Sequence, residues 1–145
     1  MKKKFVPYLI AKDLKKIGYD VPCFARYTKH QDVLQLSISE CCYDMVSGKM
    51  LYGNIKNFND DFYKKEGTIS APSWDDVIDW LRKKYYFNLL LNGVDVEDKT
   101  WTARIVDVRF STNISIVDDY KNYDEARENT IIKSIELIKK LIKNK

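Results

Sequence analysis

The chain has 145 residues and a formal net charge of +4, and 45% of its residues are hydrophobic and 13% aromatic. This composition excludes a disordered chain, and the small numbers of Gly and Pro exclude a collagen-like or low-complexity one. No window approaches the apolar run of about 20 residues that spans a bilayer, so we expect no membrane association. The length predicts one domain over residues 1–145, with residues 40–69 as an irregular insertion.

The positive charge is concentrated at the two ends of the chain. Residues 1–30 carry eight Lys and Arg against two acids, residues 31–98 have an acidic excess, and residues 99–145 have a basic one. A basic N-terminus attracts nucleic acid, but it is also typical of a solvated tail, which is the interpretation we favour. The candidate phosphate contacts are Lys2, Lys3, Lys4, Lys12, Lys15 and Lys16.

The start of the chain and the cysteines both indicate a cytoplasmic protein. The apolar stretch after the first lysines is interrupted by Pro7 and ends at Lys12, and no small-residue cleavage site follows. Cys23, Cys41 and Cys42 are odd in number and two of them are adjacent, which favours reduced thiols over a disulfide framework.

The N-terminal half predicts one helix and one hairpin. Apolar spacing indicates an amphipathic helix over residues 8–17, ended by Gly18. Residues 23–28 and 33–39 have strand character and are joined by a polar loop. A short strand is predicted at Met50, Leu51 and Tyr52, after a turn at Ser47-Gly48, and residues 54–67 are predicted to be mostly loop.

Residues 74–85 form the clearest predicted element. Ser73 and Asp76 have capping-box spacing, and Trp74, Val77, Ile78, Leu81 and Tyr85 lie on one helical face. Acids in the first turn and bases in the last match the helix dipole.

The remaining chain predicts a three-stranded antiparallel meander followed by a helix. Its strands are expected at residues 87–91, 101–110 and 113–117, with turns at Asn92-Gly93 and Ser111-Thr112. Asn122 and Glu125 then begin a helix over residues 123–142. Its apolar stripe comprises Ala126, Thr130, Ile131, Ser134, Ile135, Leu137, Ile138, Leu141 and Ile142.

The predicted fold is therefore α+β, a small antiparallel sheet with helices 74–85 and 123–142 on one face. The N-terminal helix and hairpin extend this sheet or pack beside it.

The sequence contains no pattern that specifies catalysis, a metal or a cofactor. His30 has no nucleophile placed beside it, and the cysteines lack zinc-binding spacing. Adjacent acids such as Asp118 and Asp119 point apart on a strand. We expect no cofactor and no metal.

Aromatic side chains are the remaining candidates for a binding surface. By helical position Trp80 lies at the edge of its stripe, and Tyr85 and Tyr86 end that helix. Partly exposed Trp and Tyr are typical of binding surfaces, although core lining is the more common use of such rings.

Two stretches resemble a family of small proteins encoded by phages, prophages and other mobile elements of Bacteroides-type bacteria. Residues 11–23 (AKDLKKIGYDVPC) are similar to the opening of that family, AxxLKxxGFDxPC. Residues 70–73 (SAPS) with 80–85 (WLRKKY), and residues 123–126 (YDEA), are similar to its later blocks. These motifs are caps, helix ends and core positions, so the resemblance implies a fold and a bacterial setting, but no activity.

These observations favour a non-enzymatic accessory protein of a phage or mobile element that acts through a protein partner, with homo-oligomerisation left open. The first alternative is nucleic-acid binding through the basic termini. A weaker alternative is a small hydrolase or nuclease that uses loop carboxylates and His30.

Overall fold

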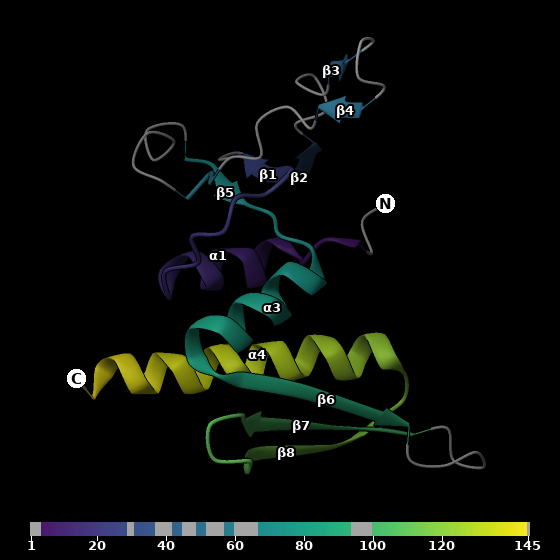
Figure 1. Cartoon of the computed structure of the whole chain (residues 1–145), viewed down its shortest axis with the longest axis vertical. Coiled ribbons are helices and arrows are strands. Elements are labelled where there is room, and N and C mark those ends of the chain that lie inside the picture. The colour runs from purple at the N-terminus through teal and green to yellow at the C-terminus, as the bar shows by residue number, and fades with distance from the viewer. Residues whose placement is uncertain are drawn as a thin grey trace. The chain divides into compact units, whose positions relative to one another are not determined.

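The computed structural model describes residues 4–28, 31–36, 42–44, 49–51, 57–59, 67–93 and 100–144. It confirms the α+β class and divides the chain into two compact units, Met1–Asp76 and Val77–Lys145 (Figure 1). That residues 1–145 form a single domain stays a prediction. No helix in the described residues is both long enough and apolar enough to cross a membrane.

The first unit opens with α1 (Tyr8–Lys16), in agreement with the expected helix. Pro7 precedes it with φ −59°, and Gly18 follows in the left-handed region at φ 81°, where a residue without Cβ is favoured. The buried face of α1 consists of Ile10, Ala11 and Leu14.

The predicted hairpin is confirmed as β1 (Ala25–Thr28) and β2 (Gln31–Leu36), which pair antiparallel. The second strand begins two residues earlier than expected. On its other edge β1 pairs with β5 (Ile69–Ser70), which gives the strand order β2-β1-β5.

Two further short strands lie within residues 40–69, the expected irregular insertion. β3 (Cys42–Asp44) pairs antiparallel with β4 (Lys49–Leu51), so the strand expected at Met50 and Leu51 is confirmed. β3 and β5 were not predicted, because strands of two or three residues are too short to carry a periodic hydrophobic pattern and neither was marked by a turn signal such as the Ser47-Gly48 pair before β4.

The helix α3 (Trp74–Tyr85) has the predicted bounds and begins with the predicted capping box. The amide N–H of Asp76 donates to Ser73 Oγ at 3.1 Å, and the amide N–H of Ser73 donates to Asp76 Oδ2 at 3.3 Å. Because α3 begins before Val77 and ends after it, one continuous helix belongs to both units.

The second unit contains the predicted meander, in the strand order β6-β7-β8. β6 (Phe87–Gly93) pairs with β7 (Trp101–Asp107), which pairs with β8 (Thr112–Tyr120). The turn expected at Asn92-Gly93 is wrong, since these residues still pair with Thr102 and Trp101. The backbone pairing of β7 overrides the local turn signal.

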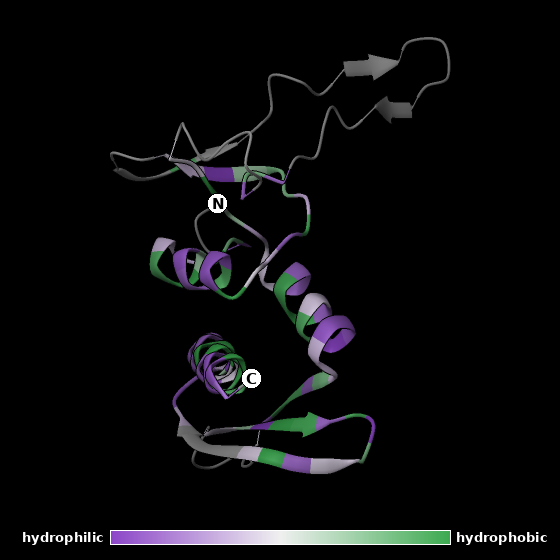
Figure 2. Ribbon diagram, turned by 90° about the vertical axis from the view of Figure 1, so that its left-hand side faces the viewer, coloured by the Kyte–Doolittle hydropathy of each residue, from purple (hydrophilic) through white to green (hydrophobic). Residues whose placement is uncertain are grey.

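The final helix α4 (Tyr123–Lys143) lies along one face of this sheet. Residues 77–85 of α3, which belong to the same unit, lie on the same side of the sheet as α4 (Figure 2). Asn122 caps α4 as predicted, because its side chain accepts the Glu125 amide N–H at 2.9 Å. Between Ala126 and Ile138 every member of the stripe is buried except Leu137, which is half-buried. α4 packs on β7, whose Ala103 and Ile105 are also buried. Burial is not observed for Leu141 and Ile142, which are each 52% exposed.

Candidate functional site

The second unit contains a pocket of about 300 Å³, which we call the Tyr86 pocket. Three segments distant in sequence form it: the junction of α3 and β6, the turn between β7 and β8, and the last turns of α4. Its lining residues are Lys84, Tyr85, Tyr86, Phe87, Arg109, Leu141 and Ile142.

Tyr86 occupies the single position between α3 and β6, where the chain changes direction. Its φ is 61°, a left-handed backbone conformation that a bulky residue adopts only at a cost of about 1–2 kcal/mol. Two backbone hydrogen bonds hold it there: its N–H donates to the Arg82 carbonyl at 3.1 Å, and its carbonyl accepts the Val108 N–H at 2.9 Å. The ring is 45% exposed.

Arg109 is held in place by Asp107, two residues before it. Its Nε donates to Oδ1 of the carboxylate at 3.0 Å, and its Nη2 donates to Oδ2 at 2.6 Å. The backbone N–H of Arg109 donates to the same carboxylate at 2.9 Å. These hydrogen bonds lower the pKa of Asp107, and the carboxylate in turn raises the pKa of the Arg109 guanidinium.

The guanidinium of Arg109 contacts two aromatic rings. Its Cζ lies 4.7 Å from the Tyr86 ring centroid and 5.3 Å from that of Phe110. A guanidinium at this distance from a ring face is a cation–π contact. Asp107, Arg109, Tyr86 and Phe110 therefore form one connected cluster, in which a buried carboxylate orients the cation and the cation orients the rings.

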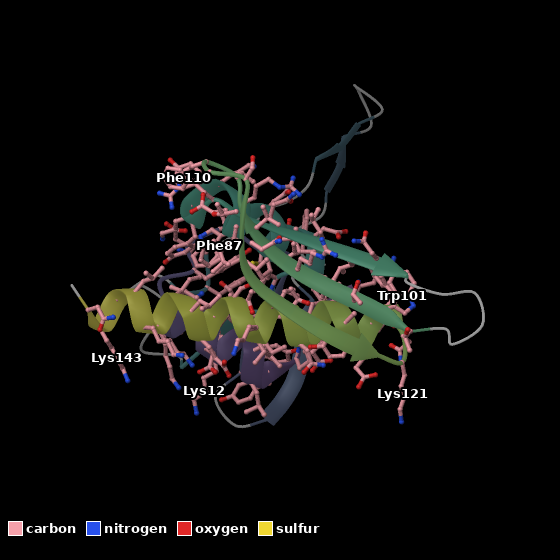
Figure 3. The ribbon with its side chains drawn as sticks, turned by 90° about the horizontal axis from the view of Figure 1, so that it is seen from below. Lys12, Phe87, Trp101, Phe110, Lys121 and Lys143 are labelled. Carbon is pink, nitrogen blue, oxygen red and sulfur yellow. The ribbon has the colours of Figure 1, made fainter. Side chains whose placement is uncertain are left out.

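The pocket has an apolar rim. Phe110 is 69% exposed, and Leu141 and Ile142 are exposed at the end of α4. Figure 3 places Phe110 at the end of the sheet opposite to Trp101. With Tyr86, these side chains are four of the eleven large apolar side chains that are exposed in the described residues. Isolated exposed apolar residues are ordinary, whereas a group on neighbouring elements is typical of an interaction site.

The three aromatic residues predicted as binding candidates differ in their positions. Tyr86 and Tyr85 line the pocket. Trp80 is only 4% exposed, which agrees with the favoured core-lining interpretation and not with a position on a partly exposed binding surface. Its ring packs edge-on against the Tyr85 ring at a centroid distance of 5.2 Å, and the Lys84 Nζ lies 5.1 Å from the Trp80 ring centroid. Trp80 therefore contacts two of the residues that line the pocket.

The basic N-terminal residues belong to the first unit, whereas the pocket lies in the second. Lys4 and Lys12 are exposed, while Lys15 Nζ donates to the Thr68 carbonyl at 2.9 Å and Lys16 pairs with Asp13 at 3.0 Å. Lys2 and Lys3 lie outside the described residues.

The catalytic and metal candidates lie partly inside and partly outside the described residues. His30 and Cys41 lie outside the described residues. Cys23 is free and buried, and burial raises its pKa to about 12, which makes its thiol a poor nucleophile. In the described ranges no three His, Cys, Asp or Glu side chains are grouped in a way that could hold a metal ion.

Sequence reasoning missed Arg109, Phe110, Leu141 and Ile142 as site residues. The strand expected over 101–110 in fact ends at Asp107, because its carboxylate and carbonyl accept the N–H groups of Arg109 and Phe110 and close a turn. The expected lengths held no signal for α4, because a strand over residues 101–110 would be about 33 Å long and the 21 residues of α4 extend about 31 Å. The seven residues of β7 extend only about 23 Å, so the last turns of α4 extend beyond β7.

Comparison of the chain with protein-family models, with curated proteins and with solved structures finds no match.

Proposed function

We propose that this chain is a non-enzymatic accessory protein that binds a protein partner through the Tyr86 pocket. The observation that carries the proposal is the exposed apolar and aromatic rim around Arg109. Aromatic residues and Arg are the residue types enriched at the centres of protein interfaces, where they are anchored by contacts within their own chain. Arg109 and Tyr86 have such anchors in Asp107 and in the backbone pairing with Val108.

The strained backbone at Tyr86 supports the same proposal. An aromatic residue in the left-handed region costs folding free energy that Gly would not cost, and such strain is concentrated at functional positions. The rim also costs free energy, because Leu141 and Ile142 expose apolar surface to water. A partner that covers the rim would recover this free energy.

The bacterial setting also belongs to the proposal. It rests on the similarity of residues 11–23 and 123–126 to small phage and mobile-element proteins of Bacteroides-type bacteria. The partner is then a protein of the element or of its bacterial host.

Site-specific photo-crosslinking tests the proposal. A photoreactive phenylalanine is placed at Phe110 or, as the matched control, at Leu9, which is 73% exposed on α1 of the other unit. In a lysate of a Bacteroides-type host we expect nuclease-resistant protein adducts from position 110 that Leu141→Ser prevents. Adducts equal at both positions contradict the proposal, and nuclease-sensitive adducts favour the nucleic-acid alternative.

A further inference from the structure

We infer that the Tyr86 pocket takes an acidic segment of the partner protein that carries a bulky apolar side chain. This inference rests on the proposed function and adds the chemistry of the partner. It is derived from the charge of the pocket, from the chemistry of its rim and from the arrangement of charge over the second unit.

The lining is positively charged. Of its seven residues Lys84 and Arg109 are basic, and none is acidic. The nearest carboxylate on the Arg109 side is Asp107, which is 10% exposed and already accepts hydrogen bonds from Arg109. A guanidinium has more N–H donors than the two that Asp107 takes, so Arg109 retains donors for a second carboxylate.

The surroundings of the pocket increase this preference. The last turn of α3 carries Arg82, Lys83 and Lys84, and the last turn of α4 carries Lys140. A helix end contributes only about half a negative charge, which is less than the basic charge of either turn. Two of the four acids of α4, Asp124 and Glu125, lie in its first turn, at the opposite end of the unit (Figure 1). Glu128 follows within the next turn, and Glu136 pairs with Lys133 at 3.5 Å. This separation of charge draws an acidic segment toward the pocket.

The apolar part of the segment is indicated by the rim and by the volume. Leu141 and Ile142 offer aliphatic area, and about 300 Å³ has room for one large side chain. Single-stranded nucleic acid is the rival ligand, because it also binds where aromatic rings lie among basic residues. Here the Arg109 guanidinium stands over both exposed rings, which leaves less ring surface for bases to stack on.

The test uses the full chain and three labelled synthetic peptides. One is Glu-rich with a central Leu-Phe pair, the second has Lys at each Glu position, and the third replaces the Leu-Phe pair by Ala-Ala. We expect the first to bind about tenfold more tightly than either of the others, with binding that weakens as salt is raised, and to shift the NMR methyl signals of Leu141 and Ile142. Equal binding of all three peptides, or no binding at about 1 mM, overturns the inference.

Two charge reversals distinguish local from overall attraction. Lys84→Glu and Lys143→Glu change the net charge equally, but Figure 3 shows Lys143 and Phe110 on opposite sides of the α4 ribbon. We expect Lys84→Glu to weaken the Glu-rich peptide about tenfold and Lys143→Glu less than about threefold, in proteins whose methyl spectra remain folded. Equal losses overturn the inference, as does competition by single-stranded DNA at the Leu141 methyls. If position 110 gives protein adducts but the acidic peptide is not preferred, the proposed function holds and the inference about the acidic segment is wrong.

Discussion

At the scale of single residues, Tyr86 combines an exposed ring with an unfavourable backbone. The left-handed conformation is unfavourable because a Cβ atom comes close to the following carbonyl oxygen, and Gly removes that atom. The ring and the backbone therefore make separate contributions, and substitutions can divide them.

We predict that Tyr86→Gly is more stable than Tyr86→Ala by about 1 kcal/mol, measured by urea denaturation. Both variants lose the ring and its contact with Arg109, so their difference reports the backbone alone. Lys83 is the matched control, because it is exposed and helical, and there Gly is expected to be less stable than Ala by about 1 kcal/mol. The same sign at both positions would show that Tyr86 is not strained.

Alkaline pH tests a buried pair of acids in the first unit. Burial raises the pKa of Cys23 from 9.0 to about 12, and it also raises the pKa of Tyr19 well above 10.0. The unfolded chain thus releases these protons at a lower pH than the folded chain does. Stability from this source is present below pH about 9 and is lost as the pH rises toward the folded values, by at most about 1.4 kcal/mol per pH unit for each group.

We predict that the free energy of unfolding decreases between about pH 9 and pH 11, and that Cys23→Ala and Tyr19→Phe each reduce this decrease. Denaturant titrations over that range measure it. The control is Tyr123→Phe, which removes a phenol that is 41% exposed. If all four proteins lose stability in parallel, the buried pair is not the cause.

At the scale of elements, α4 changes from a core helix to a surface helix along its length. Ile138 is fully buried, whereas Ile142, one turn later, is 52% exposed. The same apolar stripe therefore stabilises the fold at one end and lines the pocket at the other. Substituting these two isoleucines separates the two roles.

We predict that Ile138→Ala lowers the free energy of unfolding by about 2–5 kcal/mol and Ile142→Ala by less than about 0.5 kcal/mol. Thermal and urea denaturation measure the difference. Although Ile142→Ala should leave the protein folded, we expect it to abolish the protein adducts from the photoreactive residue at position 110. Equal destabilisation by the two variants would place Ile142 in the core.

The elements that could be predicted from the sequence are those with local signals. Ser73 and Asp76, and Asn122 and Glu125, close hydrogen bonds within three residues, so the starts of α3 and α4 follow from the sequence. β3 and β5 could not be predicted, because two or three residues show no period and, unlike β4, neither was marked by a turn signal in the sequence. The Tyr86 pocket was predicted only in part, through Tyr85 and Tyr86, because Arg109 and Ile142 join it by tertiary contact.

At the scale of the whole molecule, the two units share one helix. α3 begins with a cap at Ser73 in the first unit and ends at Tyr85 in the second. The cap of α4 at Asn122 lies wholly within the second unit. The two caps therefore lie in different units, although Ser and Asn stabilise a helix N-terminus by similar amounts.

We predict that Ser73→Ala increases amide hydrogen exchange in both units, while Asn122→Ala does so only in the second. Losing a cap costs about 1 kcal/mol, which is about a fivefold faster exchange wherever exchange depends on that helix. The amide exchange rates are measured in β1 and β7, because each is the central strand of its sheet and pairs with a neighbouring strand on both sides. Ser73→Thr, which retains the hydroxyl that accepts from the Asp76 N–H and donates to Asp76 Oδ2, is the control and should preserve slow exchange. If Ser73→Ala accelerates exchange in β1 and leaves β7 unchanged, α3 is held in the second unit by its packing alone and the cap stabilises only the unit in which it lies.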